Sequence, residues 1–127
     1  MAKKDKASHT DEVRRYVTLQ RSATVEYVEK KSVFYGHAAP VKSQEEALAF
    51  LADKRKQYSD ATHNVYAYLL DGGNITRYSD DGEPQGTAGL PVLDVIRKNQ
   101  FCDAVIVVTR YFGGILLGTG GLVRAYS

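Results

Sequence analysis

The residues of this chain that could do chemistry gather in two glycine-rich blocks, residues 78–89 and residues 110–121. The first block carries three carboxylates, and the second opens on an arginine followed by two aromatic rings. Glycine loses more conformational entropy on folding than any other residue, so its concentration indicates tight turns or N–H groups that face a ligand. Each block also precedes a segment of helical character, so we expect a binding surface at two helix N-termini. The candidate binding residues are Asp80, Asp81, Gly82, Glu83, Gly86, Thr87, Arg110, Tyr111, Gly113, Gly114, Gly118, Thr119, Gly120, Gly121 and Arg124.

The second block has the setting of a phosphate-binding loop, because it follows a strand-like run and precedes a helix. A nucleotide-hydrolysing loop requires a lysine after its last glycine, and Thr119 occupies that position. The dinucleotide fingerprint also fails, since Val123 stands where its third glycine is required. An anion held by free N–H groups at a helix N-terminus stays open.

The acidic loop of the first block has two interpretations. Asp80, Asp81 and Glu83 could hold Mg²⁺, which takes carboxylate oxygens. Aspartate followed by glycine is also ordinary turn chemistry, and these carboxylates could instead accept hydrogen bonds from backbone N–H groups of their own loop. We predict a structural turn or a recognition surface here, with no metal and no cofactor.

The histidines and the single cysteine give no complete catalytic set. His9, His37 and His63 lack the spacing of metal ligands. His63 stands just before a strand, where a general base is conceivable and a hydrogen-bonded strand-end histidine is the simpler interpretation. Cys102 excludes an internal disulfide framework, and its apolar setting favours a small buried side chain over a nucleophile. We expect no catalytic residue.

The segment Arg110, Tyr111, Phe112 follows a strongly apolar run. Arginine beside aromatic rings is typical of protein hot spots and of platforms for single-stranded nucleic acid. In the other interpretation Phe112 covers the core and Arg110 pairs with the acidic loop. Both interpretations stay open.

Composition indicates one ordinary globular domain. The chain has 127 residues, 43% of them hydrophobic, with a formal net charge of +2. That charge is far below the Lys/Arg excess of a dedicated DNA-binding domain, and it neither requires nor excludes RNA contact. The chain contains no apolar run of roughly 20 residues, and its charged N-terminus lacks the apolar core of a secretion signal. We expect a cytoplasmic protein without membrane contact.

Five strands are predicted from alternating or apolar runs. Residues 23–29 and 32–38 predict one hairpin, and residues 64–70 and 75–78 predict another around a glycine turn. Residues 104–109 form a near-continuous apolar run, which predicts an interior strand covered on both faces.

Three helices are predicted between and after these strands. Ser43 and Glu46 form a capping box that opens a helix through about Tyr58. Pro91 lies in the first turn of a second helix, and a third begins near Leu122. We therefore predict an α+β two-layer sandwich, a mostly antiparallel sheet with helices on one face. The residues expected to face inward from the first helix are Ala47, Leu48, Phe50 and Leu51.

The two blocks also carry a family resemblance. Residues 78–84 with 86–89 and Pro91, and residues 110–126, resemble the two signatures of the Impact family, called YigZ-like in bacteria. The resemblance extends from about Thr24 to the end of the chain and implies a ribosomal-protein-like α+β fold. It also implies a role near translation. Eukaryotic Impact restrains a stress-responsive kinase by binding that kinase's activator protein, and nucleic-acid binding has been proposed for bacterial members.

These observations combine into one domain prediction and one functional prediction. We expect residues 1–20 to form a poorly ordered basic lead-in. Residues 21–127 are expected to form an Impact N-terminal-like domain, truncated within its last helix, without the family's second domain, and prone to self-association. The predicted function is a non-catalytic binding or regulatory module of the translation or stress-response machinery, with a translation-associated protein or RNA, including the ribosome, as partner. The alternative is a Mg²⁺-dependent phosphate- or nucleotide-binding enzyme that uses the loop of Asp80, Asp81 and Glu83.

Overall fold

The computed structural model describes residues 22–127, which form five strands and three helices. The predicted lead-in at residues 1–20 and His9 lie outside the described residues. Every neighbouring pair of strands is antiparallel, in the order β1-β2-β5-β3-β4. The strands are β1 (Ala23–Glu29), β2 (Ser32–Pro40), β3 (His63–Leu70), β4 (Ile75–Ser79) and β5 (Ala104–Tyr111). The helices are α1 (Gln44–Gln57), α2 (Gly89–Lys98) and α3 (Gly118–Tyr126), and a single turn of 3₁₀ helix, η2 (Asp71–Gly73), joins β3 to β4.

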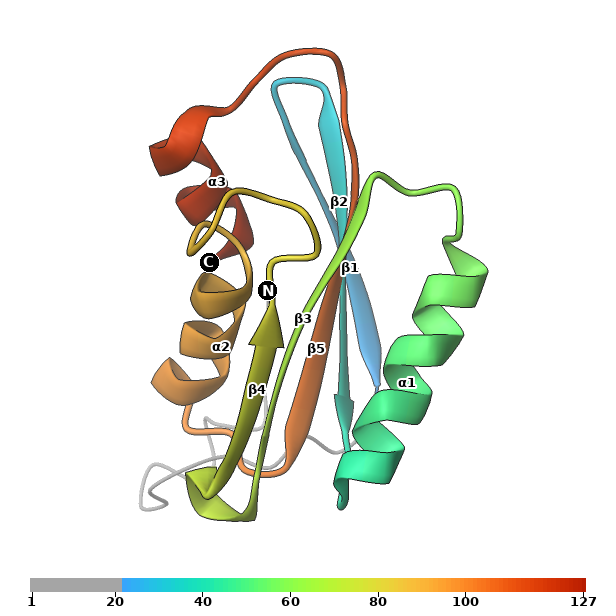
Figure 1. Cartoon of the computed structure of the whole chain (residues 1–127), viewed down its shortest axis with the longest axis vertical. Coiled ribbons are helices and arrows are strands. Elements are labelled where there is room, and N and C mark those ends of the chain that lie inside the picture. Colours follow the sequence, from blue (N-terminus) through green and yellow to red (C-terminus); the bar gives the residue numbers. More distant parts are fainter. Residues whose placement is uncertain (1–21) are drawn as a thin grey trace.

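The predicted α+β class and antiparallel sheet are confirmed, but the prediction that all helices lie on one face is wrong. Figure 1 shows α1 on one side of the sheet and α2 with α3 on the other. The reason lies in β5, whose side chains are apolar on both faces. Val105 and Val107 pack in a cluster with α1, and Ile106 and Val108 pack in a cluster with α2 and α3. A strand with apolar side chains on both faces requires cover on both, so the helices divide between them.

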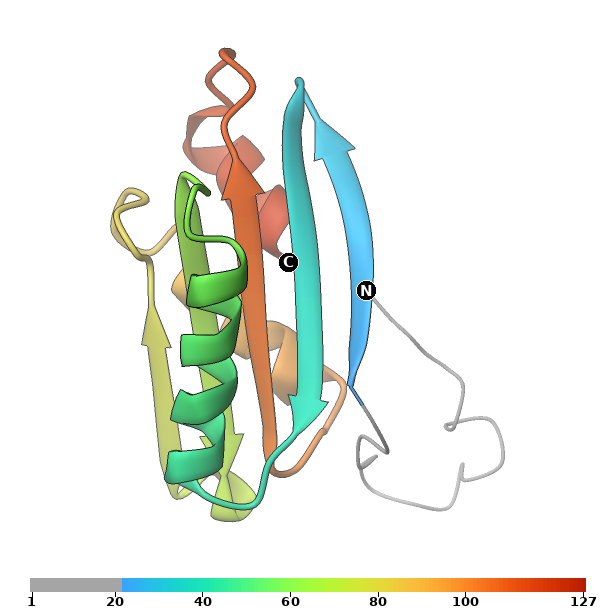
Figure 2. The same cartoon turned by 90° about the vertical axis from the view of Figure 1, so that its right-hand side faces the viewer.

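The start of α1 follows the predicted capping box. The Glu46 N–H donates to Ser43 Oγ at 3.1 Å, and the Glu46 carboxylate accepts from the Lys42 N–H at 2.7 Å. Among the residues expected to face inward, the prediction for Leu48 is wrong, because Leu48 is 44% exposed. The helix lies over β3 and β5, and Figure 2 shows β1 and β2 uncovered by it on this side of the sheet. Leu48, next to the buried Ala47, therefore turns outward. None of the helices within residues 22–127 has the length and apolar character to cross a membrane.

The strand directions bring the two glycine blocks to one end of the sheet. Strands β4 and β5 run in the same direction, because both are antiparallel to β3. Their C-terminal ends, each followed by a glycine block, therefore lie at the same end as the start of β2 and β3 (Figure 1). The register also places Phe34, Arg110 and His63 in one row across β2, β5 and β3, so their side chains share a face.

Candidate functional site

The first glycine block is organised around the Asp80 carboxylate. It accepts hydrogen bonds from the N–H of Gly86 at 3.0 Å, of Ala88 at 3.2 Å and of Gly89 at 2.8 Å. The last two groups are at the N-terminus of α2, where unpaired N–H groups and the helix dipole favour a negative charge. The chain's own carboxylate thus occupies the anion position of this helix. The Asp81 carboxylate likewise accepts a backbone hydrogen bond, from the N–H of Asn64 in β3 at 2.6 Å.

Glu83 and Arg110 form a buried ion pair at the centre of the site. Their side chains are 3% and 6% exposed, and Arg110 Nη1 donates to both carboxylate oxygens, at 3.0 and 2.7 Å. The Tyr126 hydroxyl donates to Glu83 Oε2 at 2.5 Å. Arg110 Nε and Nη2 donate to Ser32 Oγ at 3.3 and 3.2 Å, and the Gly113 N–H donates to the same oxygen at 3.2 Å. This network joins both glycine blocks to β2 and α3, and it confirms that Arg110 pairs with the acidic loop. The accompanying expectation that Phe112 covers the core is wrong, because Phe112 is 45% exposed.

The network also sets the protonation of Tyr126. Burial, together with the hydrogen bond to Glu83, raises the pKa of Tyr126 well above that of an ordinary phenol. The hydroxyl therefore keeps its proton and remains a donor to the carboxylate.

His63 is the hydrogen-bonded strand-end histidine that the sequence predicted. Its Nδ1 lies 2.6 Å from the carbonyl oxygen of Asp81, which can only accept, so Nδ1 carries the proton. Its Nε2 points to the ion pair, 3.6 Å from Glu83 Oε1. Gly82 makes this approach feasible, since a Cβ there would lie 3.1 Å from the ring and its φ of +93° is a left-handed value.

A cavity of about 440 Å³ opens between the two glycine blocks. Its floor is polar, because it contains His63 and the Glu83–Arg110 pair. Its rim is apolar and strongly exposed: Leu116 is 80% and Phe112 is 45% exposed. The remaining lining residues are Thr62, Pro84, Leu117, Gly118, Thr119 and Leu122.

Arg110 and Tyr111 do not form one contact patch, contrary to the hot-spot interpretation. Successive residues of a strand point to opposite faces, so Tyr111 projects to the side of α1. There its hydroxyl donates to Asp60 at 2.8 Å, and its ring meets Tyr35 edge to face at 6.2 Å. The hydrogen bond to Asp60, with desolvation, raises the pKa of Tyr111 to about 12.

The remaining predicted site residues shape the loops around the cavity. At Gly113 a Cβ would lie 2.1 Å from the backbone of Lys31, so only glycine allows this loop to meet the β1–β2 turn. Thr87 Oγ1 donates to the Pro84 carbonyl at 2.6 Å and closes the turn of the first block. Gly114, Gly118, Thr119 and Gly120 are exposed, whereas Gly121 is buried. A Cβ at Gly121 would lie 3.1 Å from Cβ of Leu117. Arg124 is exposed on α3.

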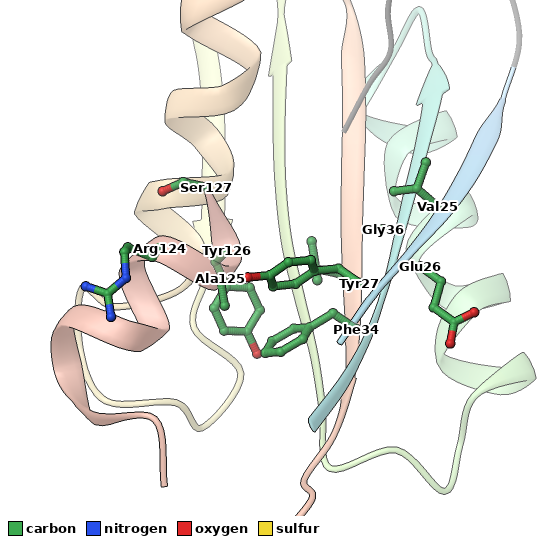
Figure 3. Close-up of a pocket in the computed structure, with 10 residues that line it drawn as sticks. Val25, Glu26, Tyr27, Phe34, Gly36, Arg124, Ala125, Tyr126 and Ser127 are labelled. Carbon is green, nitrogen blue, oxygen red and sulfur yellow. The ribbon is translucent and has the colours of Figure 1, made fainter. Parts of the chain in front are cut away.

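A second hollow, of about 360 Å³, lies between α3 and β1. Figure 3 shows Tyr27 beside the rings of Phe34 and Tyr126, with Arg124 extending away from them. The Phe34 and Tyr126 rings meet edge to face at 5.3 Å. The exposed apolar side chains near this hollow belong to the edge strand β1, while β5 is buried along nearly its whole length. Self-association through such a surface stays a prediction.

Sequence reasoning did not select Ser32, Tyr126 or Leu116 as site residues. Ser32 and Tyr126 are polar side chains buried in the structure, and no local sequence pattern marks either of them as part of a site. The rim position of Leu116 had no signal, because an apolar triplet in a loop also suits ordinary packing.

Comparison with known proteins agrees with this architecture. Residues 30–127 match the family model of the Impact N-terminal domain, and the chain belongs to the Impact family. The IMPACT family member YvyE of Bacillus subtilis is 46% identical over 113 residues, 88% of this chain and 52% of that protein. The chain spans about half the length of the curated relatives it matches.

Two solved structures share the fold. A crystal structure of a hypothetical protein superposes with a TM-score of 0.81 at 41% identity and covers 84% of this chain and 53% of that one. The two-domain translational regulator Yih1 superposes with a TM-score of 0.55 at 20% identity, over 99% of this chain and 53% of that chain. At that identity the likeness to Yih1 shows the fold alone.

Proposed function

We propose that this chain is a non-catalytic binding module with a regulatory role in the translation or stress-response machinery, and that it contacts its partner through the two glycine blocks. The observation that carries the proposal is the buried Glu83–Arg110 network, which holds two exposed loops around a preformed cavity. Preformed concave sites with a few fixed polar groups are typical binding sites. Membership of the Impact family and the description of Yih1 as a translational regulator support the regulatory role.

A protein partner suits this surface better than RNA. The rim consists of exposed apolar side chains, Leu116 and Phe112, which are typical of protein contacts. RNA affinity depends on cations that neutralise phosphates. Arg110 cannot serve in that way, because Glu83 already neutralises it in the interior. The exposed Arg124 is the cation of the predicted site that remains for a phosphate.

The enzyme alternative receives less support from the geometry of the acidic loop. Asp80 accepts three backbone hydrogen bonds, Asp81 accepts one, and Glu83 is paired with Arg110. A Mg²⁺ ion bound by these oxygens would have to compete with the bonds that hold the loop and the N-terminus of α2. Among residues 22–127, no three His, Cys, Asp or Glu side chains are grouped as a metal-binding set.

Affinity capture with two matched variants tests the proposal. The chain serves as bait in a cell lysate, with Leu116→Asp on the cavity rim and Leu48→Asp on the opposite face, where Leu48 is 44% exposed. We expect translation-associated proteins to be retained by the wild type and by Leu48→Asp, and lost with Leu116→Asp, whether or not nuclease is added. Loss on nuclease treatment alone points to RNA, and capture unaffected by Leu116→Asp removes the glycine blocks from the proposal. The proposal also places the protein in the cytoplasm, which cell fractionation checks.

A further inference from the structure

We propose that the loop after β5 docks an acidic segment of a protein partner, one that carries apolar side chains between carboxylates. The inference rests on the proposed function, because it takes the glycine-block surface as the contact and names the chemistry of the segment that covers it. Three features of the surface carry it: an exposed apolar loop, a turn of two lysines beside that loop, and an arginine on the loop's other side.

The apolar side chains of this loop are exposed and partly fixed in place. Phe112 is 45%, Ile115 is 42% and Leu116 is 80% exposed. The Arg110 guanidinium lies over the Phe112 ring, 5.5 Å from its centre, and the Phe112 N–H donates to Thr62 Oγ1 at 2.9 Å. Exposed apolar side chains that are already held in place suit a protein contact, because binding orders them at little cost in entropy.

A turn of two lysines lies directly beside this loop. The register Glu29↔Ser32 leaves Lys30 and Lys31 as the two-residue turn between β1 and β2. A Cβ added to Gly113 would lie 2.6 Å from the Cβ of Lys31, so the Lys31 side chain starts next to the apolar loop. Figures 1 and 2 both show the two segments at the same end of the sheet. The turn therefore places positive charge beside the exposed apolar side chains.

The backbone of this turn does not favour lysine. The φ angles of Lys30 and Lys31 are +47° and +68°, left-handed values that Asn-Gly adopts most readily in a two-residue hairpin turn. Within residues 22–127 neither lysine is in an ion pair, and the adjacent Glu29 carboxylate instead accepts from the Tyr27 hydroxyl. Lysines at a sheet edge also hinder pairing with other chains, which is the competing explanation of their presence. Charge offered to a partner explains both their position and their lack of a counter-ion in this part of the chain.

A third cation lies on the other side of the apolar loop. Arg124 Nη1 would lie 3.5 Å from a Cβ at Gly120, and Arg124 Nη2 would lie 3.8 Å from a Cβ at Gly121. The guanidinium therefore lies along the first turn of α3, in space that the two glycines leave free. Cations thus flank the exposed apolar loop on both sides. A segment with carboxylates on both sides of apolar residues complements that arrangement in charge and in polarity.

RNA would use the cations of this surface and leave its apolar side chains without a role. Phosphates pair with lysine and arginine, but bases bind single-strand platforms by stacking on aromatic rings. The aliphatic side chains of Ile115 and Leu116 offer no such ring. An acidic peptide with apolar residues uses both features of the surface.

Peptide titration with a variant of the lysine turn tests the inference. The fluorescein-labelled peptide Gly-Asp-Glu-Leu-Phe-Glu-Asp-Gly is titrated with the 127-residue chain at low salt, and binding is followed by fluorescence anisotropy. Three probes serve for comparison: the peptide with Ser-Ser in place of Leu-Phe, the peptide with lysine in place of each acidic residue, and octauridylate. We expect the acidic apolar peptide to bind most tightly of the four probes.

The turn variant combines Lys30→Asn with Lys31→Gly. It should weaken binding of the acidic apolar peptide about fivefold, the value of two exposed ion pairs. In urea unfolding the same variant should be more stable than the wild type, because Asn-Gly suits the turn. A purely structural role of the lysines does not predict a gain in stability together with a loss of affinity.

Four further variants serve as controls for charge and position. Lys30→Arg with Lys31→Arg keeps both charges and should keep the affinity. Arg124→Gln should weaken binding about twofold, the value of one exposed ion pair. Leu116→Asp should weaken it as well, whereas Lys56→Gln, at an exposed lysine of α1 on the other face, should leave it unchanged.

Each result supports or overturns the inference. Unchanged affinity of the turn variant assigns the lysines to the sheet edge and overturns it, as does equal binding of the Ser-Ser peptide. Tighter binding of octauridylate than of the acidic apolar peptide assigns the cations to RNA and overturns the protein source. If capture from lysate depends on Leu116 and not on the turn, and no peptide binds, the proposed function stands and only the acidic segment is wrong. If the acidic apolar peptide binds as expected and capture ignores Leu116, the inference stands and the proposed function is wrong.

Discussion

The two faces of the sheet bury polar groups in different ways, and the contrast is sharpest at two neighbouring residues of β5. Arg110 points to the side of α2 and α3 and enters a charged network with Glu83. Thr109 points to the side of α1 and joins a series of hydrogen-bonded, uncharged side chains, the neutral chain, in which its hydroxyl donates to Asn64 Oδ1 at 2.7 Å. His37 lies 3.3 Å from the same hydroxyl through Nε2 and 3.1 Å from Thr24 through Nδ1. Each donor of this chain is satisfied if Nε2 carries the proton.

The difference lies in what each set of bonds connects. The neutral chain connects side chains of four adjacent strands, so it stabilises the pairing of the sheet itself. The charged network connects β2 and β5 to the acidic loop and to α3, so it positions exposed segments relative to one another. A buried ion pair is weak evidence for stability, since its desolvation offsets most of its attraction. Its placement under two exposed loops indicates that it serves the geometry of the binding surface.

Removing Glu83 should produce the largest effect on stability. Glu83→Ala leaves the Arg110 guanidinium buried without a counter-charge, which costs about 3–5 kcal/mol in comparable cases. Thr109→Val breaks the neutral chain and should cost about 1–3 kcal/mol. Urea unfolding of both variants measures the two costs. Equal costs would remove the energetic difference between the faces.

Acid should weaken the α1 face selectively through His37. Burial, with a contribution from Lys54, lowers the pKa of His37 from 6.5 to about 4. Because the folded-state pKa is the lower one, the contribution is fully present above pH 6.5 and is lost as pH falls toward 4. The loss is on the order of 3 kcal/mol over that window. An NMR titration of the His37 ring checks the pKa directly.

A matched variant isolates that contribution from the carboxylates that also titrate in acid. Unfolding free energies of wild type and His37→Gln at pH 7 and pH 4.5 should differ, with a smaller acid loss in the variant. A ring that titrates near pH 6.5 in the folded protein contradicts a buried neutral histidine on this face.

The free energy of unfolding should fall by an intermediate amount when Asp80, the acceptor that holds the loop of the first glycine block, is removed. Asp80→Ala leaves three backbone N–H groups without their acceptor, two of them at the N-terminus of α2. We expect a loss of about 2 kcal/mol, the upper range for a helix cap. Asp94→Ala, which removes an exposed partner of Arg97 at 3.8 Å, is the control and should change stability by less than about 0.5 kcal/mol. Thermal unfolding compares the two, and an equal shift would show that the capping of α2 contributes nothing.

Much of the fold was predictable because its signals are local. The capping box of Ser43 and Glu46 and the alternation along residues 23–29 depend on neighbours in the chain, and both elements formed as predicted. The face on which α1 packs was not predictable in that way. It depends on which elements, distant in the sequence, pack against each face of β5. No residue of α1 determines that packing alone.

The site shows the same division. The pairing of Arg110 with the acidic loop was among the sequence interpretations, since a buried charge requires a partner of opposite charge. The separation of Arg110 from Tyr111 followed from strand alternation and was available from the sequence. The cavity was not predictable, because Leu116, Pro84 and His63 meet there only through the sheet order.

The smallest effect should come from Tyr111, on the exposed border of the α1 face. Tyr111→Phe removes one solvent-accessible hydrogen bond to Asp60, so stability should change by less than about 0.5 kcal/mol, and capture of a partner by the glycine blocks should be unchanged. The pKa of Tyr111, raised to about 12, gives a direct measure of the contact. The raised value means that the contribution is present below pH 10 and lost as pH rises toward 12. Asp60→Asn should return the Tyr111 titration, followed by ultraviolet absorbance, toward the ordinary value near 10. If Tyr111→Phe instead abolishes capture while Leu116→Asp does not, the binding surface lies on the neutral face and the functional contrast between the two faces is reversed.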